Sequence, residues 1–190
     1  MECEKRKKTP GTYALVMWLP ATQQSLQIGE LGTFHYESGW YVYVGSAKGP
    51  GGIKSRTDRH LTLHRENAKP LIWNIDDLRE AVVIEEIWFS YDEASLEHEW
   101  SQAIMKHFRA EVPVKRFGSK DCKAKCPAHL FRLAKRPVAA ALRSAFNPNK
   151  KLIHLEFVSS SHGKQNKIEH LAQKSASTAP SRVKNKFGRK

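Results

Sequence analysis

Residues 40–60 read WYVYVGSAKGPGGIKSRTDRH, and this stretch decides the fold around it. The aromatic and β-branched run from Trp40 to Val44 is typical of a strand. Glycine and proline then interrupt the run, and residues 53–64 have the composition of a basic helix. The stretch predicts a strand, a glycine turn and a helix that presents Arg56 and His60 on one face, four residues apart. It lacks the Gly-Lys-Ser/Thr ending of a nucleotide-binding P-loop.

Further strands are predicted before this stretch. Residues 13–19 form an apolar run closed by Pro20, and residues 25–28 and 33–36 are shorter candidates separated by glycines. Short strands joined by glycine turns favour an antiparallel meander.

Helices and one more strand are predicted after it. Residues 71–78 have apolar positions at helical spacing, and residues 82–89 are strand-like. A long helix follows with an apolar stripe from Leu96 to Phe108, and Asp92 or Ser95 is its expected N-cap. Together these elements predict an α/β protein of the α+β type, with a small, mainly antiparallel sheet flanked by helices.

The composition bounds the size and the partners of the protein. The chain has 190 residues, of which 40% are hydrophobic, which is enough for one domain and an appendage. Its net charge of +13 favours a polyanionic partner, with DNA as the first expectation and RNA not excluded. The longest apolar run is too short to cross a bilayer, and the charged first residues do not resemble a signal peptide. Three cysteines fit a reducing compartment, so we expect a cytoplasmic protein without a membrane partner, and association with the nucleoid stays open.

Changes in composition predict four regions. Residues 1–10 are a polar lead-in, residues 11–145 the main domain, and residues 146–158 a C-terminal extension. Residues 159–190 are rich in serine and lysine and are predicted to be a disordered basic tail. Such a tail would either keep the protein soluble or attract phosphate backbones in a salt-dependent way.

Five residues are candidates for phosphodiester chemistry. Tyr13, Tyr43 and His60 can transfer protons, and Arg56 can clamp a phosphate. Glu97 offers the hard oxygen ligand that Mg²⁺ or Mn²⁺ prefers, and helical spacing places it beside the apolar stripe of its helix. The spacing does not decide whether Tyr13 or His60 is the general base.

Two tripeptides among these residues carry a family resemblance. Gly11-Thr12-Tyr13 and Tyr43-Val44-Gly45 resemble the two motifs that name the GIY-YIG nuclease superfamily. Arg56 and His60 in SRTDRH, and Glu97 in SLEHEW, match the positions that follow in that family.

The similarity is closest to a prokaryotic, Uri-type subgroup that has a long hairpin-like insertion between the two motifs, and it covers Gly11 to Leu133. His98 stands where that subgroup has a cysteine. The resemblance implies a GIY-YIG-like domain and a metal-dependent endonuclease that hydrolyses DNA, with the five residues above as its site.

A second set of residues has the spacing of metal ligands. Cys122, Cys126 and His129 form a C-x3-C-x2-H pattern that would give zinc three ligands, with a fourth from His98 or elsewhere. The alternative is that the cysteines are simply buried and free.

Basic residues beside the glycine turn are candidates for binding nucleic acid. Contacts with a nucleic-acid backbone are expected from Lys48, Lys54 and Arg59.

Two other functions stay open: a catalytically inactive nucleic-acid-binding module, and a zinc-stabilised interaction protein. A pure binding module has no need for Arg56, Glu97 and both tyrosines together.

Overall fold

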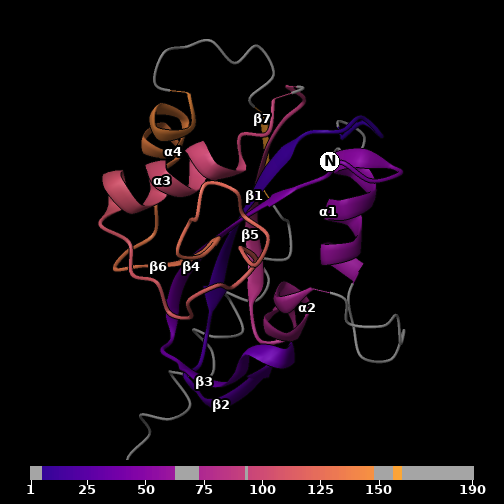
Figure 1. Ribbon diagram of the computed structural model, residues 1–190. Coiled ribbons are helices and arrows are strands. Elements are labelled where there is room, and N and C mark those ends of the chain that lie inside the picture. The colour runs from indigo at the N-terminus through magenta and orange to yellow at the C-terminus, as the bar shows by residue number, and fades with distance from the viewer. Residues whose placement is uncertain (1–5, 63–72, 93, 148–155, 160–190) are drawn as a thin grey trace, which may run out of the picture.

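The computed structural model describes residues 6–62, 73–92, 94–147 and 156–159. Its centre is an antiparallel sheet of five strands in the order β6-β4-β1-β5-β7 (Figure 1). The strands of this sheet are β1 (Thr12–Leu19), β4 (Gly39–Ser46), β5 (Val83–Ser90), β6 (Leu130–Leu133) and β7 (Glu156–Ser159). The helices are α1 (Gly52–Thr62), α2 (Asn74–Arg79), α3 (Glu97–Phe108) and α4 (Ala139–Phe146). The predicted α+β fold, a mainly antiparallel sheet flanked by helices, is confirmed.

Strand β1 lies in the middle of the sheet because its side chains are apolar on both faces. All of its residues except Trp18 are buried, which is typical of a strand covered on both sides. It pairs with β4 from Thr12 opposite Ser46 to Leu19 opposite Gly39, and with β5 on its other edge. The apolar run that the sequence predicts as a strand is thus the axis of the domain.

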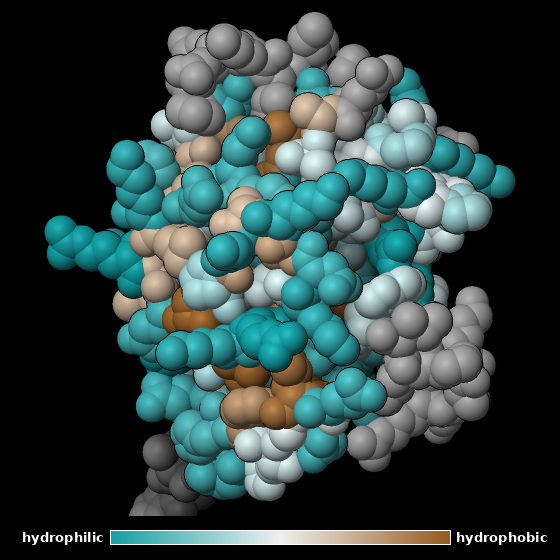
Figure 2. All heavy atoms as spheres, viewed as in Figure 1, coloured by the Kyte–Doolittle hydropathy of each residue, from teal (hydrophilic) through white to brown (hydrophobic). Residues whose placement is uncertain are grey.

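Helices cover both faces of the sheet. One face packs Leu15, Met17 and Tyr41 with residues of α1 and α2, including Ile53 and Leu78. The opposite face packs other residues of β1 and β4 with α3 and α4, and Figure 1 shows these two helices together on that side. In the view of Figure 2 the surface is mostly hydrophilic, with small hydrophobic patches between polar side chains. The apolar residues are therefore concentrated in two layers on either side of the sheet.

The predicted meander is wrong in one respect, because β1 pairs with β4 and not with the next strand of the chain. Strands β2 (Gln23–Ile28) and β3 (Gly32–Tyr36) instead form a separate antiparallel sheet of two strands, joined by a short 3-10 helix. The N–H of Gly29 in this connection donates to Asp77 Oδ2 of α2 at 2.8 Å. All eight residues of β1 pair with β4, so the two short strands form an insertion between β1 and β4 in the chain.

The helix α3 does not begin at either predicted cap. Its N-cap is Leu96, which has no capping side chain, and the Leu96 N–H donates to Thr12 Oγ1 at 3.1 Å. Asp92 is instead hydrogen-bonded to Ser90. The first turn of α3 is thereby attached to the start of β1, one residue before Tyr13.

The two ends of the described chain are packed against the domain. In the polar lead-in, Arg6 is buried, and its guanidinium contacts Asp58 at 2.9 Å and Thr57 at 2.8 Å. From the C-terminal extension, β7 adds an edge strand beside β5. The predicted basic tail, residues 159–190, lies outside the described residues except for Ser159, which is the last residue of β7. Within the described ranges, no helix has the length and apolar character needed to cross a membrane.

Gly11, just before β1, has no room for a side chain. A Cβ at this position would lie 2.1 Å from the carbonyl oxygen of Ser90. We therefore expect Gly11→Ala to lower the free energy of unfolding by about 1–3 kcal/mol, because the backbone of β1 or β5 must move. Urea denaturation measures the loss. Gly49→Ala is the control, since its Cβ would come no closer than 3.8 Å to another group, the Arg56 guanidinium. Equal losses in both variants would contradict this account.

Candidate functional site

Tyr13, Tyr43 and His60 lie together between the sheet and α1. Tyr13 Oη and His60 Nε2 share a hydrogen bond of 2.8 Å. The rings of Tyr13 and Tyr43 are 6.3 Å apart, as are those of Tyr43 and His60. His60 is fully buried and Tyr43 is 8% exposed. Three residues that are far apart in the sequence thus form one buried group.

Gly45 makes room for this group. It pairs with Tyr13 across the β1–β4 ladder, and a Cβ on it would lie 2.7 Å from the Tyr13 hydroxyl. Any larger residue would push the ring of Tyr13 away from β4 and toward His60. Close packing therefore requires a glycine after Val44, because any side chain there would lie between the Tyr13 ring and the sheet.

Arg56 lies half-buried on α1, one turn before His60. Its guanidinium carbon is 3.8 Å from the centre of the Trp73 ring, and among the described residues it makes no ion pair or hydrogen bond. Arg59 also faces Trp73, and it forms an ion pair with Asp76 at 2.7 Å. The sequence analysis missed Trp73, because the residues between α1 and α2 separate it from Arg56 and no spacing rule connects them.

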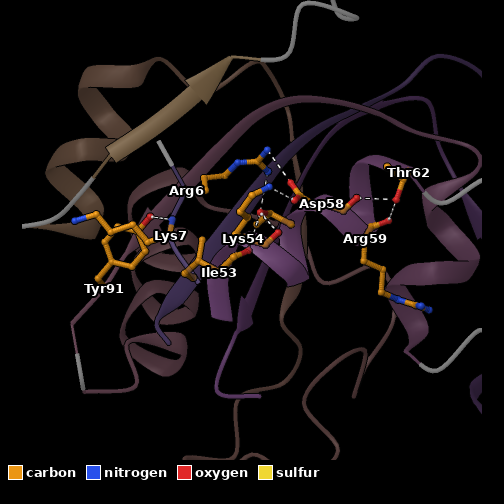
Figure 3. A network of polar contacts seen from close by, with 9 residues as sticks. Arg6, Lys7, Ile53, Lys54, Asp58, Arg59, Thr62 and Tyr91 are labelled. Atoms are coloured by element: carbon orange, nitrogen blue, oxygen red, sulfur yellow. Dashed lines mark hydrogen bonds and ion pairs between the residues drawn. The ribbon is translucent and has the colours of Figure 1, made fainter. Parts of the chain in front are cut away.

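The glycine turn itself is not arranged to bind phosphate. The N–H groups of Ile53 and Lys54, in the first turn of α1, donate to the carbonyl oxygens of Thr9 and Lys7 at 3.0 Å each. Lys7 is held in turn, since its N–H donates to Tyr91 Oη at 2.6 Å (Figure 3). Because backbone donors at a helix N-terminus are what an anion would use, the lead-in occupies that site. The N–H groups of the first turn of α1 are therefore not available to a phosphate.

A pocket of about 560 Å³ opens over the start of α1. Arg56, Lys54, Arg59 and Trp73 belong to its lining, whereas Tyr13, Tyr43 and His60 do not. Lys54 is paired with Asp58 at 2.5 Å. Lys48, the third predicted backbone contact, is exposed on the turn outside this pocket. The pocket and the buried group meet at Arg56.

Glu97 is the first residue of α3, on the other side of the site. Its Oε1 lies 3.4 Å from His129 Nδ1, and its side chain is 19% exposed. Burial raises the pKa of this carboxyl, but hydrogen bonding to His129 and Ser46 outweighs burial, and the net pKa is lowered. The neighbouring Glu99 is exposed. Glu97 is therefore an ionised carboxylate that faces inward.

Electrostatic effects connect the two sides of the site. Burial raises the pKa of Tyr13 and of Tyr43 well above the ordinary value, and the negative charge of Glu97 raises both further. The pKa of His60 is lowered to about 3, mainly by burial and to a smaller extent by the positive charges of Arg79 and Arg56. At neutral pH the buried group is uncharged, with a cation on one side and a carboxylate on the other. Such an arrangement can bind a phosphate and move a proton close to it.

The predicted metal ligands are also brought together. One ligand atom from each of His98, Cys122, Cys126 and His129 lies within 4.8 Å of the others, so this cluster could bind a metal such as zinc. His98, which stands next to Glu97 in α3, supplies the fourth position. Among the described residues, no comparable cluster of three or more such side chains surrounds Glu97.

The buried His60 makes stability depend on pH. In the unfolded chain this histidine takes up a proton below about pH 6.5, whereas in the folded protein its pKa is about 3. The free energy of unfolding must therefore decrease as the pH falls below 6.5, by up to about 1.4 kcal/mol per pH unit. We expect His60→Gln to remove this part of the slope, as measured by urea denaturation at about pH 7, 6 and 5. His107→Gln, at an exposed histidine of α3, is the control. The same slope in His60→Gln and in the wild type would show that His60 is not buried in its neutral form.

Comparison with known proteins gives one match. The model of a family described as "Domain of unknown function DUF123" matches residues 12–151, a range that contains every candidate residue from Tyr13 to His129. No curated protein and no solved structure matches the chain. Because the match covers most of the 190 residues, the chain belongs to the DUF123 family.

Proposed function

We propose that the protein is a metal-dependent endonuclease of the GIY-YIG type, which hydrolyses phosphodiester bonds in DNA. The observation that carries the proposal is the hydrogen bond of 2.8 Å between Tyr13 and His60, formed beside Tyr43 and Arg56. The two tyrosines come from the two motifs that resemble those of the nuclease superfamily, and the arginine and histidine come from one face of α1. The proximity of Tyr13, Tyr43 and His60 supports the proposal.

Arg56 is the residue that would bind the scissile phosphate. One flat face of its guanidinium packs on Trp73, with 3.8 Å between the guanidinium carbon and the ring centre. The N–H groups at the edge of the guanidinium remain available to a phosphate. Two of these N–H groups can donate to two phosphate oxygens at once, and the charge stabilises the extra negative charge of the transition state. Arg56 also lines the pocket through which a strand would approach.

Tyr13 and His60 would remove the proton of the attacking water. In this step the water gives a proton to Tyr13 Oη, Tyr13 gives its own proton to His60 Nε2, and the hydroxide attacks phosphorus as the P–O bond to the leaving oxygen breaks. His60 would act through Tyr13, with which it shares the hydrogen bond. Burial is the main cause of the low pKa of His60, and a bound phosphate would offset the smaller contribution that the charge of Arg56 makes to it. Tyr43, the most exposed of the three, would position the water or the phosphate.

Glu97 fits a magnesium or manganese ion. It is an ionised, partly exposed carboxylate without another acidic ligand in the described part of the chain, and Mg²⁺ typically takes one or two carboxylates and keeps its waters. Such an ion would supply charge stabilisation for the leaving oxygen. Glu97 would hold it through the carboxylate oxygen that does not face His129.

The charge of the chain favours DNA as the substrate, and RNA is the alternative. The excess of 13 positive charges attracts a phosphate backbone without regard to sequence. Lys48 is free to contact such a backbone, and Lys54 and Arg59 border the pocket. We expect the activity in the cytoplasm, on nucleoid DNA.

Removal of the charge of Glu97 tests the enzyme. We expect Glu97→Gln to lower the Mg²⁺-dependent cleavage of supercoiled, flap and junction DNA by at least about 100-fold, because the metal ligand is lost. Glu99→Gln, two residues along the same helix, is the matched control and should cleave like the wild type. Equal cleavage by Glu97→Gln and Glu99→Gln would reject the assignment of Glu97.

One observation favours the second candidate, an inactive nucleic-acid-binding module. Tyr13 and His60 are almost completely buried and lie outside the pocket. If the wild type shifts DNA in a salt-dependent way but forms no product with Mg²⁺ or Mn²⁺ on any of these substrates, the binding module is the better description.

A further inference from the structure

The proposed hydrolysis gives no role to the cluster of His98, Cys122, Cys126 and His129. Cys122 Sγ is 3.1 Å and Cys126 Sγ 3.9 Å from His98 Nδ1. The ligands around a tetrahedral zinc ion with ordinary bond lengths are roughly 3.3–3.8 Å from one another. The four side chains are therefore already close to the positions that a single ion requires.

Buried hydrogen-bonding groups point to a missing ligand. Both ring nitrogens of His129 are buried, and neither makes a hydrogen bond of normal geometry within the described ranges: Nδ1 faces Glu97 Oε1 at the long distance of 3.4 Å. A buried imidazole without partners is costly. A metal on Nε2, with the Nδ1–H directed at Glu97, would satisfy both nitrogens.

The loop of residues 113–129 holds three of the four side chains of the cluster close together. Residues 113–129 contain turns but no helix or strand, so little regular structure holds them. Within this loop Lys125 has a left-handed conformation (φ 52°), and the N–H of Cys126 donates to Cys122 Sγ at 3.3 Å. His129 is fixed at the end of the loop, because its N–H donates to Phe117 O and its carbonyl accepts from the N–H of Val44. The loop thus presents two thiols and an imidazole to the first turn of α3.

We propose that His98, Cys122, Cys126 and His129 bind one Zn²⁺, and that the bound ion fixes His129 so that its Nδ1–H holds the carboxylate of Glu97. Two thiolates and two imidazoles are the ligand set of structural zinc, and the ion closes the loop onto α3. A histidine that binds zinc through one nitrogen commonly donates to a carboxylate from the other. Zinc then orients the residue to which the proposed function assigns Mg²⁺. Only this last consequence rests on the proposed function.

Metal analysis of the purified full-length protein tests the site. We expect about one zinc per chain in the wild type and less than about one tenth in Cys122→Ser or His98→Ala. His98→Cys replaces one zinc ligand with another and should retain the ion. Cys3→Ser changes the remaining cysteine of the chain and should also retain it.

Cobalt binding provides a test that needs no variant. We expect wild-type protein reconstituted with Co²⁺ to show the absorption of thiolate-bound, tetrahedral cobalt, and zinc to abolish it. If the wild type takes up less than about one tenth of an ion after incubation with zinc and shows no such absorption, the site is rejected. Full retention of zinc in Cys122→Ser would reject it as well.

The connection to Glu97 is measured without DNA. We expect Glu97→Gln to weaken zinc affinity by about 10- to 100-fold, as loss of a carboxylate behind a zinc-bound histidine does. Glu99→Gln should not change the affinity. Equal affinities in the two variants would reject the connection and leave the zinc site itself standing. Because neither measurement involves cleavage, failure of the nuclease proposal would not be mistaken for failure of this one.

Discussion

The register between β1 and β4 is the constraint on which the candidate site depends. It places Tyr13 across from Gly45, where the absence of a side chain lets the tyrosine ring lie directly against the neighbouring strand. From there the Tyr13 hydroxyl reaches His60 of α1. A shift of one residue would turn Tyr13 to the opposite face of the sheet, among the residues that pack on α3. The same register positions Thr12, whose hydroxyl accepts a hydrogen bond from the N–H of Leu96 at the start of α3. The position of Glu97 therefore depends on this register as well.

The site combines a neutral interior with charged surroundings. Tyr13, Tyr43 and His60 are kept uncharged by burial, whereas Arg56 and Glu97 keep opposite charges on either side. Burial makes each proton transfer within the neutral group costly, but it also removes the water that would weaken the pull of a bound phosphate. In the proposed chemistry a bound phosphate offsets the charge of Arg56, whereas the larger effect of burial on the pKa of His60 remains.

Periodicity and turn residues predicted the strands and helices from β1 to α3, and the α+β fold followed, whereas β6, α4 and β7 were not predicted. The pairing of the strands could not be predicted in the same way. The sequence of the two short strands fits a meander and an inserted hairpin equally well, and the eight residue pairs between β1 and β4 show that the hairpin is inserted. The cap of α3 was missed because its acceptor, Thr12, is distant in sequence. Spacing did place Arg56 and His60 on one helix and Glu97 on the inner side of another. It could not find Trp73, whose contact with Arg56 exists only in three dimensions.

The most direct test of the central claim is a crystal structure of the Tyr13→Phe protein with a short DNA and Mn²⁺, since anomalous scattering locates manganese directly. Tyr13→Phe removes the hydroxyl that would accept the proton, so the DNA should remain uncut. The account predicts a manganese peak at the Glu97 carboxylate and a DNA phosphate within hydrogen-bonding distance of the Arg56 guanidinium. DNA bound with its phosphates away from Arg56, or manganese bound away from Glu97, would contradict it.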